Sequence, residues 1–241
     1  MKILIVGAAG FVGRGILVSF TEHGHALRLL DVAPFASRHE VLIGDVTDYA
    51  CVEKAVTGMD GIVIAHMAPR GIKDVNYATP EMAFNINVKG TANLFHAVVQ
   101  QGVKKVVVIS SGCVVQGNHN TSIYAQDLPL RAPGGYYGLS KICQEVIAEQ
   151  FSREHDLQVA CLRPWSVLDG EKNVDKYGQT IKARTAADTD RRDIGEVACL
   201  CLESETLRYE VFHVASTREA LEKYNVKHTC QTLGWKPELS A

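Results

Sequence analysis

Short apolar runs alternate with longer amphipathic stretches from the start of the chain to about residue 165. The runs at 2–8, 26–31, 61–68, 104–111 and 158–165 are rich in valine and isoleucine and do not alternate apolar with polar residues. That composition is typical of strands buried on both faces. The stretches 10–24, 49–58, 81–102 and 136–155 have the length and pattern of helices. This alternation predicts an α/β fold: a doubly wound parallel sheet with helices on both faces.

The pattern weakens after Trp165. Residues 166–190 are polar and irregular, whereas 193–204 and 216–224 have helical patterns and 210–216 has the pattern of a strand. We therefore expect a main domain over residues 1–164 and a small C-terminal subdomain over 165–241. The second part is expected to complete the edge of the sheet and to form one compact unit with the first.

Composition narrows the class of protein. The 241 residues include 25 basic and 27 acidic side chains and are 46% hydrophobic. This suits a globular protein with a sizeable core and does not predict nucleic acid or a membrane as partner. Seven cysteines are scattered without a CxxC pair, and the apolar start reads as a strand rather than a signal peptide. We expect reduced cysteines in or near the core, a cytoplasmic location and, because the nine histidines lack ligand spacing, no metal site.

Three glycines follow the first predicted strand directly and open the first predicted helix. Gly7 suits a tight turn, Gly10 a close approach of backbone to a pyrophosphate, and Gly13 close packing of helix on strand. The N-terminus of the helix would then present its N–H groups to phosphates. The fold is therefore expected to be of the Rossmann, dinucleotide-binding type.

Asp31 ends the second predicted strand, 18 residues after Gly13. At about this separation a carboxylate reaches the hydroxyls of the adenosine ribose, and its charge repels a 2′-phosphate. No arginine follows it directly, since Arg38 comes seven residues later. The pattern favours NAD over NADP as cofactor.

Two tyrosines precede a lysine at the start of the 136–155 helix. Only Tyr137 lies four residues before Lys141, which places phenol and ammonium on one face of the helix. A phenol has an ordinary pKa near 10 and needs a fall of about 3 units to accept a proton near pH 7, which neighbouring positive charge can supply. The alternative is that Lys141 pairs with Glu145 on a solvated face.

These motifs together resemble the extended branch of the short-chain dehydrogenase/reductase superfamily, the NAD-dependent epimerase/dehydratase group. Further matches are "GDVTD" at 44–48, "IAHMA" at 64–68, "NVKGTANLFHA" at 87–97, "VVVISSGCVVQG" at 106–117, "YGLSK" at 137–141 and "LRPWSV" at 162–167. A finer resemblance, carried by "DLPLRAPGGYYGLSK", is to uronate-dehydrogenase-like members, although Gly112 and Cys113 stand where those enzymes carry an Asn-His pair.

The resemblance implies a set of site residues. As catalytic residues it implies Ser111, Tyr137 and Lys141. As cofactor-binding residues it implies Gly7, Gly10, Phe11, Val12, Gly13, Asp31, Asp45, Val46, Ala65, His66, Met67, Asn87, Tyr137, Lys141 and Pro164.

The serine position is open to two readings. The loop "SSGCVVQG" is one residue longer than the family pattern, so counting back from Gly117 gives Gly112 and counting forward from the strand gives Ser111. We favour Ser111, because the strand fixes the direction of its side chain and Ser110 then points to the opposite face. Ser111 would hold and polarise the substrate oxygen.

The predicted function is NAD-dependent hydride transfer to or from a small hydroxylated, sugar-like substrate, with Tyr137 as general base. The alternatives are a nucleotide-sugar epimerase or dehydratase that retains NAD, and an inactive NAD-binding regulatory protein. Only 76 residues follow Trp165, which leaves little chain to hold a nucleotide. Arg191 and Arg192 lie next to Asp190 and Asp193, and we expect them to pair with these acids rather than with a diphosphate. Both observations favour a small substrate over a nucleotide sugar. The resemblance also implies a homodimer through helices 81–101 and 136–155.

Overall fold

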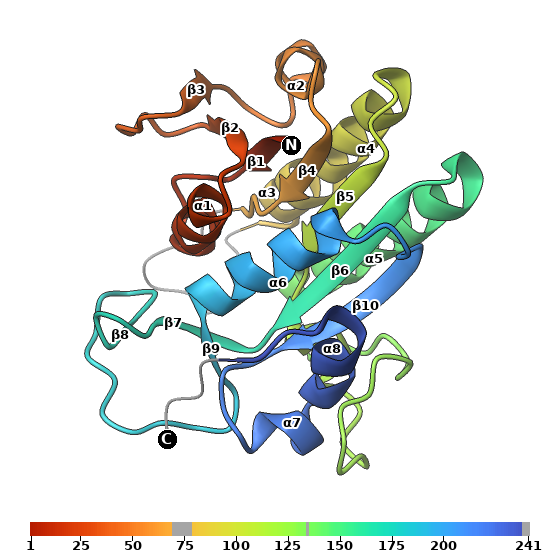
Figure 1. Ribbon diagram of the computed structural model, residues 1–241. Coiled ribbons are helices and arrows are strands. Elements are labelled where there is room, and N and C mark those ends of the chain that lie inside the picture. Colours follow the sequence, from red (N-terminus) through yellow and green to blue (C-terminus); the bar gives the residue numbers. More distant parts are fainter. Residues whose placement is uncertain (69–78, 134, 238–241) are drawn as a thin grey trace.

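The computed structural model describes residues 1–68, 79–133 and 135–237 of the protein. Its centre is a sheet of seven parallel strands in the order β10-β6-β5-β4-β1-β2-β3 (Figure 1). The strands are β1 (Lys2–Val6), β2 (Ala26–Asp31), β3 (Glu40–Ile43), β4 (Gly61–Ile64), β5 (Lys105–Ile109), β6 (Gln158–Pro164) and β10 (Tyr209–Val214). The predicted doubly wound parallel sheet is confirmed.

Helices cover both faces of this sheet. The helical elements are α1 (Phe11–Glu22), α2 (Tyr49–Val56), α3 (Pro80–Met82), the π-helical segment η1 (Ala83–Lys89), α4 (Gly90–Gln100), the 3₁₀ turn η2 (Gly112–Val115), α5 (Tyr136–His155), α6 (Arg191–Glu203), α7 (Ala220–Lys223) and α8 (Val226–Leu233). One face packs against α1, α6, α7 and α8, and the other against α2, α4 and α5. Alternate residues of one strand enter opposite cores: Ile3 and Ile5 face α1, whereas Leu4 and Val6 face α4.

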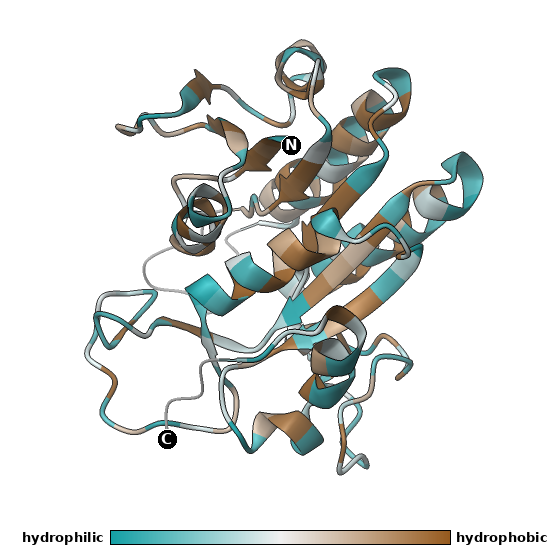
Figure 2. Cartoon of the chain, viewed as in Figure 1, coloured by the Kyte–Doolittle hydropathy of each residue, from teal (hydrophilic) through white to brown (hydrophobic). Residues whose placement is uncertain are grey.

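The central strands β1, β4 and β5 are accordingly apolar over most of their length. Figure 2 shows hydrophobic colour over most of the middle strands, with much of the hydrophilic colour at helix ends and loops. Residues 3–6 of β1 and all of β4 are buried. This explains why the sequence runs lack alternation: strands with helices on both sides have no solvated face.

One edge of the sheet differs from its sequence pattern, and the other agrees with it. Strand β3 was not among the predicted strands, and its four residues are half-buried or exposed. At the other edge, β10 pairs with β6 throughout residues 209–214, so C-terminal residues complete the main sheet. Helix α8 was also not predicted. A second, three-stranded sheet orders β8 (Val174–Asp175), β7 (Ser166–Asp169) and β9 (Asp188–Asp190) beside it.

The cysteines and the character of the helices bear on two further expectations. All seven cysteines are free, three of them buried and four half-buried. Within the described residues, no helix combines the length and the apolar character needed to cross a membrane.

Candidate functional site

A pocket of about 890 Å³ opens at the carboxyl ends of the parallel strands. Residues that end or follow β1, β2, β4, β5 and β6 all contribute to its lining. The chain leaves β1 toward β2 on one side, and β4 lies on the other, so the pocket sits where the strand order reverses. In open α/β sheets this is the place where ligands bind.

The glycine turn forms one wall of the pocket. Gly7 has a φ of +82°, and a Cβ there would come within 2.7 Å of the backbone of His66. A Cβ on Gly13 would come within 2.1 Å of the Gly7 carbonyl oxygen. Gly10 is the N-cap of α1 and no side chain caps this end. Bare backbone N–H groups at a helix N-terminus therefore face the pocket, as an anionic phosphate requires.

Asp31 stands at the end of β2 beside this turn. Its Oδ2 accepts a hydrogen bond from the backbone N–H of Ala9 at 2.9 Å, and its Oδ1 accepts one from Ala33 at 3.0 Å. Each carboxylate oxygen has a second lone pair for a ligand hydroxyl. The carboxylate thus both braces the glycine turn and offers acceptors to the pocket it lines.

Tyr137 and Lys141 enter from the first two turns of α5. The Lys141 side chain is buried, and its Nζ donates a hydrogen bond to the Ile109 carbonyl oxygen at 2.8 Å. Burial lowers the pKa of Lys141 to about 8, although nearby Cys113 and Glu145 oppose this shift. The half-buried Tyr137 lines the same pocket one helical turn away.

Glu145 has a different partner from the one that sequence spacing offers it. Its carboxylate is buried and accepts hydrogen bonds from Arg163 Nε at 2.9 Å and from Arg163 NH2 at 2.8 Å. Ser110 Oγ donates to the same carboxylate at 2.5 Å. The alternative of a solvated Lys141–Glu145 pair is therefore wrong, and the Ser110 hydroxyl is engaged by Glu145.

Ser111 faces the pocket, and Gly112 does not line it. The hydroxyl oxygen of Ser111 accepts a hydrogen bond from the Cys113 N–H at 3.3 Å and caps the turn η2. A Cβ on Gly112 would come within 2.5 Å of the Trp165 indole. Gly112 thus lies against an aromatic ring that leaves no room for a side chain.

Of the site residues implied by the sequence, all except Asn87 line this pocket. Asn87 lies behind it in η1, fully buried, where its Oδ1 accepts from the Ala68 N–H at 2.7 Å and its Nδ2 donates to Ser140 Oγ at 2.8 Å. The Ser140 hydroxyl in turn donates to the Tyr137 carbonyl oxygen at 2.9 Å. Asn87 therefore ties the loop after β4 to the start of α5.

Sequence reasoning missed an aromatic side pocket. This cavity of about 260 Å³ adjoins the main pocket and shares Ser111, Cys113, Gln116, Trp165 and Ser166 with it. Tyr124, Ala187, Lys223 and Tyr224 complete its wall, and the rings of Trp165 and Tyr224 lie 4.1 Å apart between centroids. Tyr124 comes from the polar loop and Tyr224 follows α7, so no local motif joins them.

The arginines that follow this region pair with more distant acids than expected. Arg191 forms an ion pair with Asp169 at 2.5 Å and Arg192 with Glu171 at 2.6 Å. The predicted pairing with their neighbours Asp190 and Asp193 is wrong, since Asp190 instead caps α6 through the Arg192 N–H.

The comparison with known families decides the affiliation. The model of the NAD-dependent epimerase/dehydratase family matches residues 3–222. The chain belongs to this family. The matched range includes the glycine turn and the Tyr137–Lys141 pair.

Named relatives include both dehydrogenases and epimerases. The chain is 37% identical over 134 residues to a 3 beta-hydroxysteroid dehydrogenase/Delta 5→4-isomerase of Mycobacterium tuberculosis, covering 53% of this chain and 36% of the relative. It is 29% identical over 182 residues to a uronate dehydrogenase of Pseudomonas putida, covering 72% of this chain and 63% of the relative. Each match thus covers less than two thirds of the relative.

A solved structure of a mutated uronate dehydrogenase resembles the fold over nearly the whole chain. Its TM-score is 0.79 at 25% identity, with 99% of this chain and 82% of that chain covered. The doubly wound architecture is therefore that of the family.

Proposed function

We propose that the protein is an NAD-dependent oxidoreductase that moves hydride between NAD and a small hydroxylated, sugar-like substrate. The observation that carries the proposal is the convergence of three features on one pocket. The bare glycine turn, the Asp31 carboxylate and the Ser111, Tyr137 and Lys141 side chains line the same cavity.

The pocket fits NAD from end to end. The N–H groups at the start of α1 would bind the pyrophosphate, and Asp31 would accept hydrogen bonds from the adenosine ribose. Asp45 and Val46 would lie beside the adenine, and Lys141 and Pro164 beside the nicotinamide half; all four line the pocket. When bound there, NAD supplies the hydride acceptor.

Tyr137 would handle the proton transfer of the reaction. As base it would accept the hydroxyl proton of the substrate, and the buried Lys141 ammonium one turn away lowers the free energy of the phenolate. Ser111 at the junction of the two pockets would donate a hydrogen bond to the substrate oxygen. Asn87 acts as a positioning residue through Ser140 and the Tyr137 backbone.

The side pocket supports a small substrate. Its volume of about 260 Å³ lies below the range of roughly 300–1,000 Å³ typical of drug-sized ligands. Arg191 and Arg192, which could grip a diphosphate, are already paired with Asp169 and Glu171. Lys223 lines the side pocket and could attract a carboxylate on the substrate. Aromatic rings suit the apolar face of a sugar.

A coupled assay separates this function from its alternatives. The purified protein is incubated with NAD and a panel of monosaccharides, uronic acids, polyols and nucleotide sugars, and absorbance of NADH is followed. Net NADH with a small substrate supports the proposal. An isomerised nucleotide sugar without net NADH indicates an epimerase, and NAD binding without any turnover indicates a regulatory binder.

We further propose a homodimer through α5 and the η1–α4 helix. Leu139 and Val146 lie on one face of α5 and are 46% and 52% exposed, with Ile142 and Cys143 half-buried between them. An apolar stripe at this spacing suits a two-fold interface. Light scattering should give a dimer mass, and Val146→Lys should give a monomer. Ile43→Lys, at an exposed apolar position on the β3 edge, is the matched control. A monomer mass for the unaltered protein would refute this.

The free cysteines suit a reducing compartment. Seven thiols without a disulfide are usual in cytosolic proteins. We therefore infer a cytoplasmic location, which imaging of a fluorescent fusion in the source cell would test.

A further inference from the structure

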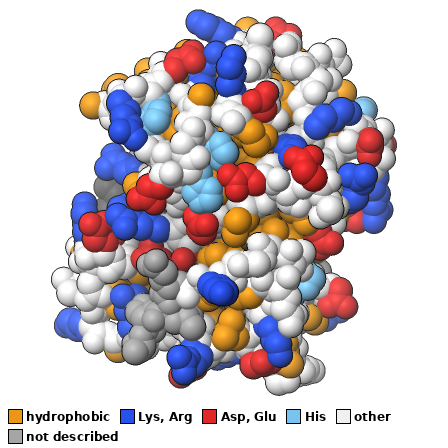
Figure 3. Space-filling view, viewed as in Figure 1, with side chains coloured by type: hydrophobic (Ala, Val, Ile, Leu, Met, Phe, Trp, Pro, Cys, Tyr) orange, Lys and Arg blue, Asp and Glu red, His pale blue; other side chains and the backbone are white. Residues whose placement is uncertain are grey.

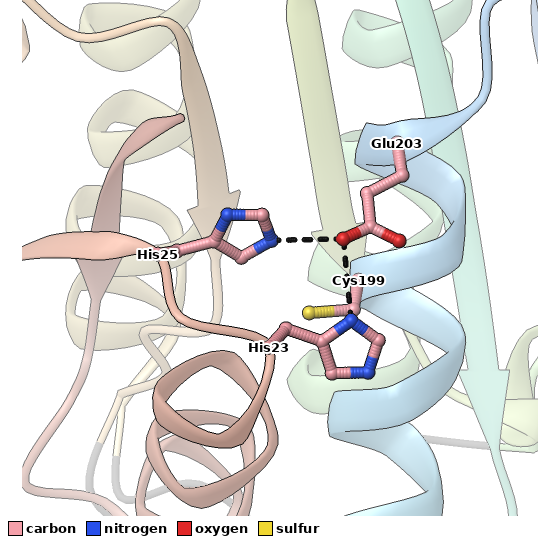
Figure 4. Close-up of side chains that lie close together, drawn as sticks. All are labelled: His23, His25, Cys199 and Glu203. Carbon is pink, nitrogen blue, oxygen red and sulfur yellow. Dashed lines mark hydrogen bonds and ion pairs between the residues drawn. The ribbon is translucent and has the colours of Figure 1, made fainter.

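Four side chains with metal-ligand chemistry meet at the end of the sheet opposite the cofactor pocket. His23 and His25 flank a glycine in the turn between α1 and β2, and Cys199 and Glu203 lie one turn apart on α6 (Figure 4). One ligand atom from each lies within 4.8 Å of the others. None of the four lines either pocket, so the dehydrogenase chemistry leaves the cluster without a role.

The packing of α1 on α6 holds the cluster together. A Cβ on Gly15 would come within 2.4 Å of the Arg191 carbonyl oxygen, and one on Gly195 within 2.5 Å of Ser19 Oγ. Ser19 also donates a hydrogen bond to the Arg192 carbonyl oxygen at 3.0 Å. The two helices are thus in close backbone contact, and the four ligands are brought near one another before any ion binds.

The nitrogen of His25 that faces the cluster contacts the Glu203 carboxylate but does not reach hydrogen-bond geometry. The His25 side chain is 7% exposed, and its buried Nε2 lies 3.2 Å from Glu203 Oε1 without hydrogen-bond geometry. A buried polar atom in this state is destabilising. A cation between this nitrogen and the carboxylate would give the Nε2 lone pair a partner. Figure 4 shows the Cys199 sulfur turned toward the same space.

His23 has the arrangement of a metal-ligating histidine. Its Nδ1 lies 3.2 Å from Glu203 Oε1, inside the cluster, and its Nε2 lies 2.9 Å from Glu196 Oε2, outside it. A ligating imidazole commonly donates its other N–H to a carboxylate, which fixes the tautomer. Glu196 therefore directs the Nδ1 lone pair into the cluster. Figure 3 shows histidine and acidic side chains gathered on this face, over the α1–α6 pair.

The C-terminal ends of α1 and α6 give the cluster an electric field that favours a cation. His23 is the C-cap of α1, and α6 ends at Glu203. The C-terminus of a helix carries partial negative charge, so two such ends favour a cation between them. The Cys199 thiol would release its proton to solvent on binding.

We propose that His23, His25, Cys199 and Glu203 form a structural zinc site. Two imidazoles, one thiolate and one carboxylate match the ligand preferences of Zn²⁺ and disfavour Mg²⁺ and Ca²⁺. Four protein ligands leave no open position, so the ion would stabilise rather than catalyse. Zinc bonds of about 2.0–2.3 Å require the widest ligand pairs to close by roughly 1 Å, within reach of side-chain rotation. The ion would clip the α1–β2 turn to α6.

The spacing of the histidines did not predict this site. The His-x-His pair and the Cys-x-x-x-Glu pair lie more than 170 residues apart in the chain, and neither has the spacing of a known zinc motif. Only the contact between α1 and α6 joins them.

Zinc titration of the full chain, without a histidine tag and after treatment with chelator, tests the proposal. Against a chromophoric competitor we expect one Zn²⁺ per chain, and at 100 times the dissociation constant a rise in Tm of about 5–10 °C. Cys199→Ala should abolish the tight site. Cys201→Ala, a buried thiol two residues along the same helix and outside the cluster, is the matched control. Glu196→Gln should weaken binding by about 10–100-fold.

Two further measurements keep the result clear if Cys199→Ala folds poorly. Glu203→Gln changes a partly exposed ligand and should fold, yet lose zinc affinity. With Co²⁺ as probe, a thiolate-to-metal charge-transfer band should appear in the unaltered protein and in Cys201→Ala, and vanish in Cys199→Ala. Equal zinc affinity in Cys199→Ala and the unaltered protein, no charge-transfer band, or no change in Tm with Zn²⁺ would each overturn the proposal and leave a network of ion pairs.

Discussion

Removal of either partner of the buried Glu145–Arg163 pair alone should lower the stability of the protein strongly. The guanidinium and the carboxylate are 3% and 2% exposed and share two hydrogen bonds of 2.8 and 2.9 Å between α5 and β6. In Glu145→Leu the Arg163 charge stays buried and keeps only its bond to the Gln126 carbonyl oxygen. Such a loss costs about 3–5 kcal/mol. For a chain of this size that corresponds to a fall in Tm of roughly 6–20 °C.

The double variant Glu145→Leu/Arg163→Met should recover most of this loss. Removing both charges also removes their desolvation penalty, and such replacements are often neutral or stabilising by about 1–4 kcal/mol. Denaturant unfolding of the four proteins of the cycle gives the coupling free energy, which we expect to exceed about 3 kcal/mol. The control is Glu149→Ala on the same helix, whose partner Arg153 is exposed, and which should cost less than about 1 kcal/mol.

A loss below about 1 kcal/mol in both single variants would refute this reasoning, because it would mean that water reaches the pair. Additive losses in the double variant would refute it as well. In that case the destabilisation would come from packing around each side chain rather than from an orphaned charge.

Three predictions concern the pocket. Tyr137→Phe should lower turnover by a factor of about 10² or more while NAD still binds, and Tyr136→Phe should do much less; the reverse order in steady-state kinetics would give the base role to Tyr136. Asp31→Ala should move the preference toward NADP by a factor of about 10–100 through the loss of charged hydrogen bonds and repulsion, and an unaltered enzyme that prefers NADP would contradict this. Because burial lowers the pKa of Lys141 to about 8, its ammonium is present below that pH and lost above it. The kcat/KM for oxidation should therefore fall as pH rises through about 8, and a profile that still climbs well above this value would argue against the role of Lys141.

The sequence predicted what depends on local spacing. The strand runs are apolar because the sheet is covered on both faces, and the glycine turn, Asp31 and the Tyr137–Lys141 pair each follow from positions within one βα unit or one helix. These features line the pocket where expected.

Features that depend on distant contacts were not predictable in the same way. Strand β3 is short and half-exposed, so its residues carry no buried run. The side pocket joins Tyr124, Trp165 and Tyr224, which no period in the sequence connects. The same is true of Arg163, whose partner on α5 is set by the register of β6 against β5.

The choice of partner for Glu145 bears directly on the chemistry of the neighbouring lysine. An acid four residues after Lys141 would neutralise the ammonium if the two paired, and the phenol of Tyr137 would then lose the field that favours its ionised form. Arg163 reaches from β6 and takes both carboxylate oxygens, while Ser110 fills a further lone pair. Lys141 is left with the neutral carbonyl of Ile109, which orients the ammonium without cancelling its charge. The buried Glu145–Arg163 pair thus leaves the Lys141 ammonium, a second buried cation, available to the pocket. It follows that losing Glu145 should also change the pH profile of activity: removal of this anion lowers the pKa of Lys141 further, so the fall in kcat/KM should move to lower pH in any Glu145 variant that still folds.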